Sequence, residues 1–318
     1  MFNQAIEAAI KAGGEILKIY AQNFEVEFKA DESPLTAADK AAHEIIVQAL
    51  ETTPYPVLSE ESAEVIYEER RNWKTYWLVD PLDGTKEFIK KNGEFTVNIA
   101  LIKNGVPIFG VVYVPVLDVV YCGMPDAESE MLDVKCGMSA WKATDCAGKS
   151  VDEIMQGAEP LSASHVPLSS NPRSLRIVAS KSHCNDETRA FIAELEKKYG
   201  AAELVSRGSS LKLCMVAEGS ANIYPRIAPT MEWDTAAAHA VIRGAGGEVF
   251  EYDPAVSADS YLCAVLKAEG RMLDVESRKL DDLSPPTSHL PPSTKQSLRP
   301  LRYNKENLLN PYFVVVGS

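Results

Sequence analysis

Apolar residues recur every three or four positions in two stretches near the start of the chain. Residues at this spacing share one face of an α-helix, so each stretch is predicted to form an amphipathic helix. The first is expected to be a helix of the folded protein and not a secretory signal, and the second to run from Thr36 to about Glu51. The apolar positions are Ile6, Ala9, Ile10, Gly13, Ile16, Leu17 and Tyr20, then Ala38, Ala42, Ile45, Ile46, Ala49 and Leu50.

Short uninterrupted apolar runs predict strands at 76–79 and 177–180. Two further runs, 111–114 and 119–122, flank a Pro-Val-Leu-Asp turn and predict a hairpin. Pro81 is expected to end the strand at 76–79, because proline cannot donate a hydrogen bond to a sheet ladder.

Helical segments alternate with these strands. The run from Ala236 to Arg243 favours a helix with Gly244 as its C′ residue. The alternation predicts a mixed α/β protein. We expect its helical and sheet layers to form two tightly packed lobes, residues 1–172 and 173–318. A cleft between two lobes is a common place for an active site.

Composition narrows the classes of partner. The net charge is −13 and the pI near 5.0, and basic stretches with interleaved aromatics are missing from the sequence, so nucleic acid is not expected as a partner. The most apolar stretch, 108–124, contains Pro115 and Asp118 and is too broken to cross a bilayer. Without C-x-x-C spacing, the six cysteines are expected to be reduced thiols of a cytoplasmic protein: Cys122, Cys136, Cys146, Cys184, Cys214 and Cys263.

The strongest chemical signal is Asp80-Pro81-Leu82-Asp83-Gly84-Thr85. Its carboxylates can hold hard cations, and backbone amides at the start of a short helical segment after it can hold a phosphate, a combination that indicates metal-assisted phosphate chemistry. A polar turn in which Asp83 caps the next helix explains the same residues, so this motif alone leaves both interpretations open. Its aspartates are one residue further apart than in the D-x-D-G-T of phosphatases with an aspartyl nucleophile, which argues against a covalent aspartyl-phosphate.

Three more acidic segments allow two interpretations each. Glu60-Glu61 follows an apolar strand end and could also be a solvated acidic loop. Asp234 stands at the start of the helix predicted around 236–243, where it could be a metal ligand or an ordinary N-cap. Asp39 lies three residues after Thr36, where it can complete a capping box or contact a catalytic hydroxyl.

Together, the four motifs resemble the lithium-sensitive, magnesium-dependent phosphatases of the inositol monophosphatase superfamily. This resemblance implies a layered α-β-α-β-α sandwich of the inositol monophosphatase and fructose-1,6-bisphosphatase type. The motifs that carry it are Thr36–Asp39, Glu60-Glu61, Asp80–Thr85 and Trp233-Asp234.

Within the superfamily, the chain is similar to the bacterial 3′(2′),5′-bisphosphate nucleotidases. These enzymes remove the 3′-phosphate of adenosine 3′,5′-bisphosphate, a by-product of sulfate activation and sulfotransfer, and several also act on 3′-phosphoadenosine 5′-phosphosulfate. Some members associate peripherally with the inner face of the membrane. The similar segments are Lys86–Ile89, Asn92–Ala100, Tyr224–Arg226 and Tyr303–Pro311.

The resemblance also implies roles for individual residues. Two or three Mg²⁺ ions would be held by Glu60, Asp80, Asp83, Asp234 and the carbonyl of Leu82, all hard oxygen donors. Thr85 would orient the attacking water, with Asp39 holding its hydroxyl, and Glu60 would share in catalysis. The remaining expected contacts are with substrate, from Gly84, Thr85, Ser180, His183, Ser209, Lys212 and Arg226. Ordinary alternatives are a helix cap at Ser180, a surface His183, a solvent-facing Lys212 and a surface ion pair for Arg226.

The chain departs from the family pattern in two segments. Residues 143–172 are expected to be a loop-like insertion, and residues 255–297 a second one with an extended or disordered tail from Ser284 to Ser293. Both leave substrate choice and the choice between monomer and homodimer open. An inositol- or sugar-phosphate phosphatase with the same metal site is the alternative activity, and a non-catalytic metal-binding structural or regulatory protein is the alternative of another class.

Overall fold

The computed structural model describes residues 1–21, 26–28, 34–62, 65–125, 138–163, 175–179, 184–268 and 298–317. Within these ranges, the larger sheet has seven strands in sequence order, with β3 and β4 parallel and the other neighbours antiparallel. They are β3 (Val57–Ser59), β4 (Thr75–Asp83), β5 (Thr96–Lys103), β6 (Val106–Val114), β7 (Val119–Gly123), β8 (Ala140–Thr144) and β9 (Glu159–Pro160).

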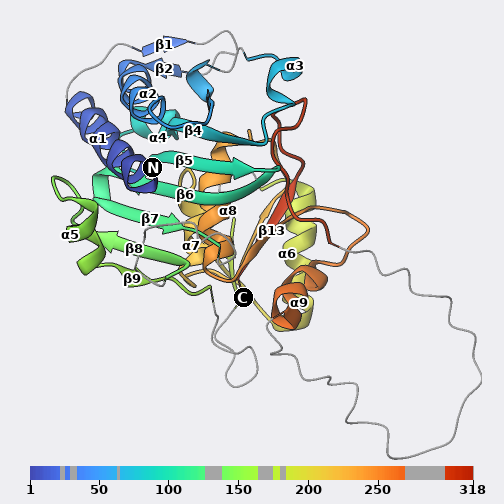
Figure 1. Cartoon of the computed structure of the whole chain (residues 1–318). Helices are drawn as coiled ribbons and strands as arrows, with labels where there is room; N and C mark the ends of the chain where they lie inside the picture. The colour runs from blue at the N-terminus through green and yellow to red at the C-terminus, as the bar shows by residue number, and fades with distance from the viewer. Residues whose placement is uncertain are drawn as a thin grey trace, which may run out of the picture.

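Helices cover both faces of this sheet (Figure 1). On one face, α1 (Phe2–Tyr20) and α2 (Ala37–Leu50) bury the two predicted apolar stripes against side chains such as Trp77 and Val111. On the other face lies α8 (Trp233–Gly244), whose alanines pack against β4, β5 and β6. The approach is close: a Cβ on Gly110 of β6 would lie 2.1 Å from the carbonyl oxygen of Ala237.

A second sheet lies behind α8. Its described strands are ordered β11 (Glu203–Val205), β10 (Arg176–Val178), β12 (Ile223–Arg226), β14 (Phe313–Val316) and β13 (Glu248–Glu251). One face packs on α8 and α7 (Leu211–Ala217), and the other packs on α6 (Asp186–Tyr199) and α9 (Ala258–Ala268). The layers run α1 and α2, sheet, α7 and α8, sheet, α6 and α9, so the predicted α-β-α-β-α sandwich is confirmed.

The remaining described elements are short. They are β1 (Val26–Phe28) and β2 (Pro34–Thr36), which pair antiparallel, η1 (Glu60–Ser62), α3 (Tyr67–Arg70), α4 (Thr85–Ile89), η2 (Pro115–Leu117) and α5 (Val151–Gln156). The predicted hairpin is confirmed, since β6 and β7 pair antiparallel around η2. In the part of the chain that the structure describes, helices are all too short or too polar to span a bilayer.

The expectation that Pro81 ends its strand is wrong. β4 continues to Asp83, but its register against β5 shifts, with Asp80 opposite Asn98 and Asp83 opposite Thr96. Pro81 and Leu82 therefore face a single residue of β5, as in a β-bulge. A proline costs no ladder hydrogen bond where the ladder is already interrupted.

Two further expectations need correction. Gly244 is the last residue of α8 and Ala245 follows in a right-handed conformation, so Gly244 is no C′ cap; a Cβ there would lie 2.1 Å from the carbonyl oxygen of Ser139. The segment 143–172 is not simply loop-like, because α5 begins with a capping box formed by Ser150 and Glu153, and β9 extends the sheet.

Parts of both expected insertions lie outside the described residues, at 164–172 and 269–297, and the latter includes the tail from Ser284 to Ser293. The second expected insertion is helical in its first part, as α9. The larger sheet takes its strands from residues 57–160 and the smaller from 176–316, yet α8 packs on both. The division into lobes at about residue 172 stays a prediction.

Candidate active site

Three aspartates meet where the bulge of β4 faces the start of α8. Asp80 and Asp83 stand on either side of the bulge, and Asp234 lies in the first turn of α8. One carboxylate oxygen of each residue lies within 4.8 Å of the others. Asp80 is 1% exposed, and the other two are half-buried. The bulge thus places two side chains of one strand beside a side chain that is distant in sequence.

Burial and mutual repulsion mark this cluster electrostatically. Burial raises the pKa of Asp80 well above its ordinary value, and the charges of Glu60, Asp83, Asp234 and Asp39 raise it further. Burial, followed by the charge of Asp83, raises the pKa of Asp234 to about 8. Carboxylates so close together are costly as bare charges. The donor set is oxygen only, so it fits a hard divalent cation, which would relieve the repulsion.

Ser210 connects Asp83 with Asp234. Its backbone amide donates to Asp83 Oδ2 at 2.7 Å, and its hydroxyl lies 2.8 Å from the same oxygen and 2.7 Å from the backbone carbonyl of Asp234. Burial raises the pKa of Asp83, while Lys212 and the Ser210 hydrogen bonds oppose the rise. Ser210 therefore orients one oxygen of Asp83 and leaves the other for the cluster.

Glu60 and Leu82, the other two predicted ligands, lie next to this cluster. Glu60 begins η1 directly after β3, and Ser59 is in register with Val79, so Glu60 stands beside Asp80. Its side chain is half-buried, and its charge acts on Asp80 and Asp234. Leu82 is buried in the bulge, where its amide donates to Asp80 Oδ1 at 3.1 Å.

Asp39 and Thr85 also come together. The Thr85 hydroxyl lies 3.5 Å from Asp39 Oδ2 and 3.5 Å from the carbonyl oxygen of Leu82. Asp39 is 1% exposed in the first turn of α2. This contact favours the interpretation of Asp39 as the partner of a hydroxyl; the side chain of Thr36, needed for a capping box, lies outside the described residues.

Gly84 allows the turn that delivers Thr85. Its φ is 95°, in the left-handed region, and a Cβ there would lie 2.1 Å from the Ser209 hydroxyl oxygen. Glycine adopts this conformation without steric cost. The Ser209 hydroxyl lies 2.8 Å from the carbonyl oxygen of Asp83 and 2.7 Å from that of Glu94, which joins the turn to the start of α7.

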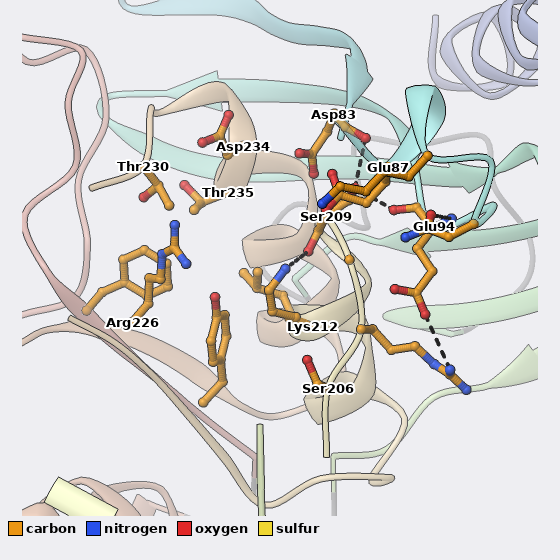
Figure 2. A pocket seen from close by; sticks show the side chains of 17 residues that line it. Asp83, Glu87, Glu94, Ser206, Ser209, Lys212, Arg226, Thr230, Asp234 and Thr235 are labelled. Atoms are coloured by element: carbon orange, nitrogen blue, oxygen red, sulfur yellow. Dashed lines mark hydrogen bonds and ion pairs between the residues drawn. The ribbon is translucent and has the colours of Figure 1, made fainter. Parts of the chain in front are cut away.

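A cavity of about 440 Å³ opens next to Asp83 and Asp234, and basic side chains lie on its wall (Figure 2). Lys212 is half-buried and donates to the carbonyl oxygen of Ser209 at 3.0 Å, so it is not the solvent-facing lysine of the ordinary alternative. Burial lowers the pKa of Lys212, and the nearby charge of Asp83 opposes this. Arg226 lines the cavity from β12 and donates to the carbonyl oxygen of Pro229 at 3.0 Å.

The sequence did not identify every residue of this site. Ser210, Asn98 and Thr230 contact the aspartates or line the cavity, and their residue types give no chemical signal. The sequence feature that could have indicated Ser210 is the Gly-Ser-Ser turn that leads into α7, at residues 208–210. Ser180 and His183, two predicted substrate contacts, lie outside the described residues.

The five-layer sandwich defines a class of layered α/β proteins, and the three aspartates beside a cavity lined by basic side chains form an acidic cluster suited to a metal ion. A sequence model of the inositol monophosphatase family matches residues 1–279, and the chain belongs to this metal-dependent family.

Individual relatives are also similar. The chain is 45% identical over 256 residues to the 3′(2′),5′-bisphosphate nucleotidase CysQ of Escherichia coli O157:H7, covering 79% of this chain and 91% of the relative. It is 44% identical, with the same coverage, to CysQ of Salmonella typhimurium. The crystal structure of CysQ from Bacteroides thetaiotaomicron, described as a bacterial member of the inositol monophosphatase family, is 43% identical, with a TM-score of 0.70 and coverage of 99% of this chain and 96% of that one.

Proposed function

We propose that this chain is a 3′(2′),5′-bisphosphate nucleotidase, a phosphomonoesterase that removes the 3′-phosphate of adenosine 3′,5′-bisphosphate. The observation that carries the proposal is the meeting of Asp80, Asp83 and Asp234 beside a cavity that also contains Lys212 and Arg226. A bisphosphate needs both features, since one phosphate reacts at the metal and the other must be neutralised nearby. The relatives at 44–45% identity bear the name of this activity.

The proposed metal ligands are Glu60, Asp80, Asp83, Asp234 and the carbonyl of Leu82. We assign the metal as Mg²⁺, because all five donors are oxygens. The site is proposed to hold two or three such ions. When bound, such ions stabilise charge on the phosphate and lower the pKa of a water molecule.

Thr85 and Asp39 are proposed to orient the attacking water. Asp39 can only accept a hydrogen bond when ionised, so the Thr85 hydroxyl, 3.5 Å away, donates its hydrogen bond to Asp39. The lone pairs of that hydroxyl are then free to accept a hydrogen bond from the attacking water, which directs the water's oxygen at the phosphorus. The backbone amides of Gly84 and Thr85 are proposed to bind the phosphate oxygens.

The substrate's second phosphate is assigned to Lys212 and Arg226, with Ser209 beside them. Both basic side chains line the same cavity as Asp83 and Asp234. An inositol monophosphate carries one phosphate and leaves this basic wall unused, which favours the nucleotide. Ser180 and His183 remain predicted contacts. We also assign the protein to the cytoplasm. Peripheral association with the inner face of the membrane stays a prediction.

The test is phosphate release from adenosine 3′,5′-bisphosphate and from inositol 1-phosphate, measured side by side with Mg²⁺, without Mg²⁺ and with added Li⁺. The proposal expects release that requires Mg²⁺, is blocked by Li⁺ and favours the nucleotide. A preference for inositol 1-phosphate would assign the chain to the other branch of the family, and no release from either substrate would contradict a phosphatase.

A further inference from the structure

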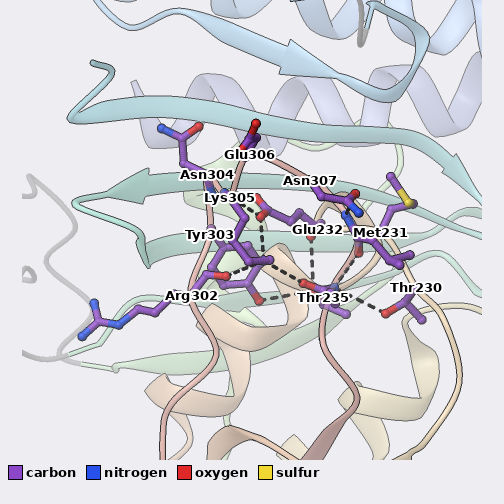
Figure 3. Close-up of polar contacts among 12 residues, drawn as sticks. Thr230, Met231, Glu232, Thr235, Arg302, Tyr303, Asn304, Lys305, Glu306 and Asn307 are labelled. Carbon is purple, nitrogen blue, oxygen red and sulfur yellow. Dashed lines mark hydrogen bonds and ion pairs between the residues drawn. The ribbon is translucent and has the colours of Figure 1, made fainter. Parts of the chain in front are cut away.

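The segment Tyr303–Asn310 crosses the start of α8, and we refer to it as the C-terminal strap (Figure 3). The sequence of this region resembles the nucleotidase branch, but the catalytic scheme gives it no role. Its position beside Glu232, two residues before the metal ligand Asp234, makes it a candidate for controlling that ligand.

Glu232 is bound to the strap through its carboxylate. The side chain is 0% exposed and accepts hydrogen bonds from the amides of Asn304 at 2.7 Å and Lys305 at 3.0 Å. The Lys305 ammonium lies 2.6 Å from Glu232 Oε1. A buried carboxylate is tolerated only when its oxygens are paired and hydrogen-bonded, and here three donors meet that need.

Backbone contacts fix the same region to the strap. The Glu232 amide donates to the carbonyl oxygen of Leu308 at 2.8 Å, and Met231 pairs with Leu309 in an antiparallel bridge. The Asn310 side-chain amide donates to the carbonyl oxygen of Met231 at 2.7 Å. The residues just before α8 are thus held like a strand against the strap.

This attachment reaches the metal ligand directly. The backbone amide of Met231 donates to Asp234 Oδ2 at 2.9 Å. The group that orients the Asp234 carboxylate therefore belongs to a residue that the strap holds in place. A shift of Glu232 or of the strap would move that amide and turn the carboxylate.

The strap is also fastened to the part of the chain that precedes β4. Arg70, 2% exposed at the end of α3, donates to the carbonyl oxygens of Lys305 and Glu306, each at 2.7 Å, and to Asn304 Oδ1 at 2.9 Å. β4 supplies Asp80 and Asp83. The strap therefore connects the start of α8, which supplies Asp234, with the segment that leads into β4.

We propose that Glu232 is a positioning residue, which anchors the C-terminal strap to the start of α8 and so holds the Asp234 carboxylate in the orientation that metal binding requires. The inference rests on the proposed function only in taking Asp234 as a metal ligand.

The test compares Glu232→Gln with Glu218→Gln. Glu218 is a suitable control because it also pairs with a lysine, with Lys142 Nζ at 2.8 Å, but contacts none of the aspartates through its hydrogen bonds. Mg²⁺ alone is titrated calorimetrically into each full-length, metal-free protein, and the melting temperature is recorded with and without Mg²⁺. Separately, kcat and KM for adenosine 3′,5′-bisphosphate are measured at saturating Mg²⁺.

Loss of a residue that orients a metal ligand typically weakens metal binding 10- to 100-fold, so Glu232→Gln is expected to raise the Mg²⁺ dissociation constant about tenfold. Its KM for the nucleotide at saturating Mg²⁺ should be unchanged, and Glu218→Gln should bind Mg²⁺ like the wild type. Equal Mg²⁺ affinity in Glu232→Gln and wild type would overturn the proposal, whatever the change in melting temperature.

If Glu232→Gln does not fold, Lys305→Met decides the question by the same titration, because Lys305 is more exposed. Its loss removes the ammonium partner of Glu232 and the hydrogen bonds to the Arg302 carbonyl oxygen and Asn310 Oδ1, but keeps both amide donors to Glu232. Wild-type protein that binds Mg²⁺ but releases no phosphate would contradict the proposed function, while the titration would still decide the role of Glu232.

Discussion

Ser210 holds Asp83 by two groups at once: its backbone amide and its hydroxyl lie 2.7 and 2.8 Å from the same carboxylate oxygen. The hydroxyl also lies 2.7 Å from the backbone carbonyl of Asp234. One serine at the start of α7 thus connects the bulge of β4 with the first turn of α8, and the aspartate cluster depends on how these three elements pack.

Replacing Ser210 with alanine removes the hydroxyl and keeps the amide. The orientation of Asp83 should loosen, so the Mg²⁺ concentration for half-maximal activity should rise about tenfold, in line with other partners of metal ligands. Activity measured across a Mg²⁺ titration checks this. Ser220→Ala is a suitable control, since among the described residues the Ser220 hydroxyl bonds only to Met215 and Glu218. An unchanged Mg²⁺ requirement in Ser210→Ala would show that the amide, with Thr96 and Asn98, positions Asp83 without the hydroxyl.

Thr85→Ala and Asp39→Asn should slow the chemical step more than they weaken substrate binding. Removing a group that acts in proton transfer typically lowers the rate by about 10² to 10⁴, and both variants should lose kcat in that range with little change in KM. Thr85→Ser keeps the hydroxyl and should retain much of the activity. Full turnover in both Thr85→Ala and Asp39→Asn would mean that water is oriented by other groups.

Lys212→Met tests the site assigned to the second phosphate. A hydrogen bond to a charged group contributes about 1.5–3 kcal/mol, so kcat/KM for adenosine 3′,5′-bisphosphate should fall roughly 10- to 100-fold. Adenosine 3′-monophosphate lacks the 5′-phosphate, so its kcat/KM should fall much less. Equal losses for the two nucleotides would place Lys212 at the reacting phosphate instead.

Replacing either of two neighbouring glycines of α1 with alanine should change the free energy of unfolding, but in opposite directions. A Cβ on Gly13 would lie 2.3 Å from the Tyr113 ring, whereas a Cβ on Gly14 would meet nothing within 4 Å. Overpacking costs about 1–3 kcal/mol, so Gly13→Ala should lower the free energy of unfolding. Gly14→Ala should raise it by roughly 0.5–1 kcal/mol, the gain of alanine over glycine within a helix. Urea denaturation measures both, and destabilisation by Gly14→Ala would contradict the packing of α1.

The elements that could be predicted from the sequence are those set by local periodicity. The stripes of α1 and α2 are apolar at helical spacing, and the β6–β7 hairpin is marked by its turn, so each follows from a few neighbouring residues. The metal-site motifs could be found because acidic residues next to apolar strands are chemically distinctive.

The remaining features depend on partners distant in sequence. Pro81 ends no strand because β5 shifts its register opposite it, and only the paired strand shows this. The need for glycine at position 244 is explained by the close approach of Ser139, not by helix termination. Ser210 is 127 residues from Asp83 along the chain, so a serine in an ordinary turn gives no sign of its role.

The most direct test of the central claim is the stoichiometry of products from adenosine 3′,5′-bisphosphate, measured for the wild type and for Asp83→Asn across a Mg²⁺ titration. The wild type is expected to yield adenosine 5′-monophosphate and inorganic phosphate in equal amounts, and only with Mg²⁺. Asp83→Asn should lose at least about 100-fold in rate at every Mg²⁺ concentration, because losing a direct ligand should cost at least as much as losing a residue that orients one. Release at the wild-type rate by Asp83→Asn, or release independent of Mg²⁺, would contradict the account.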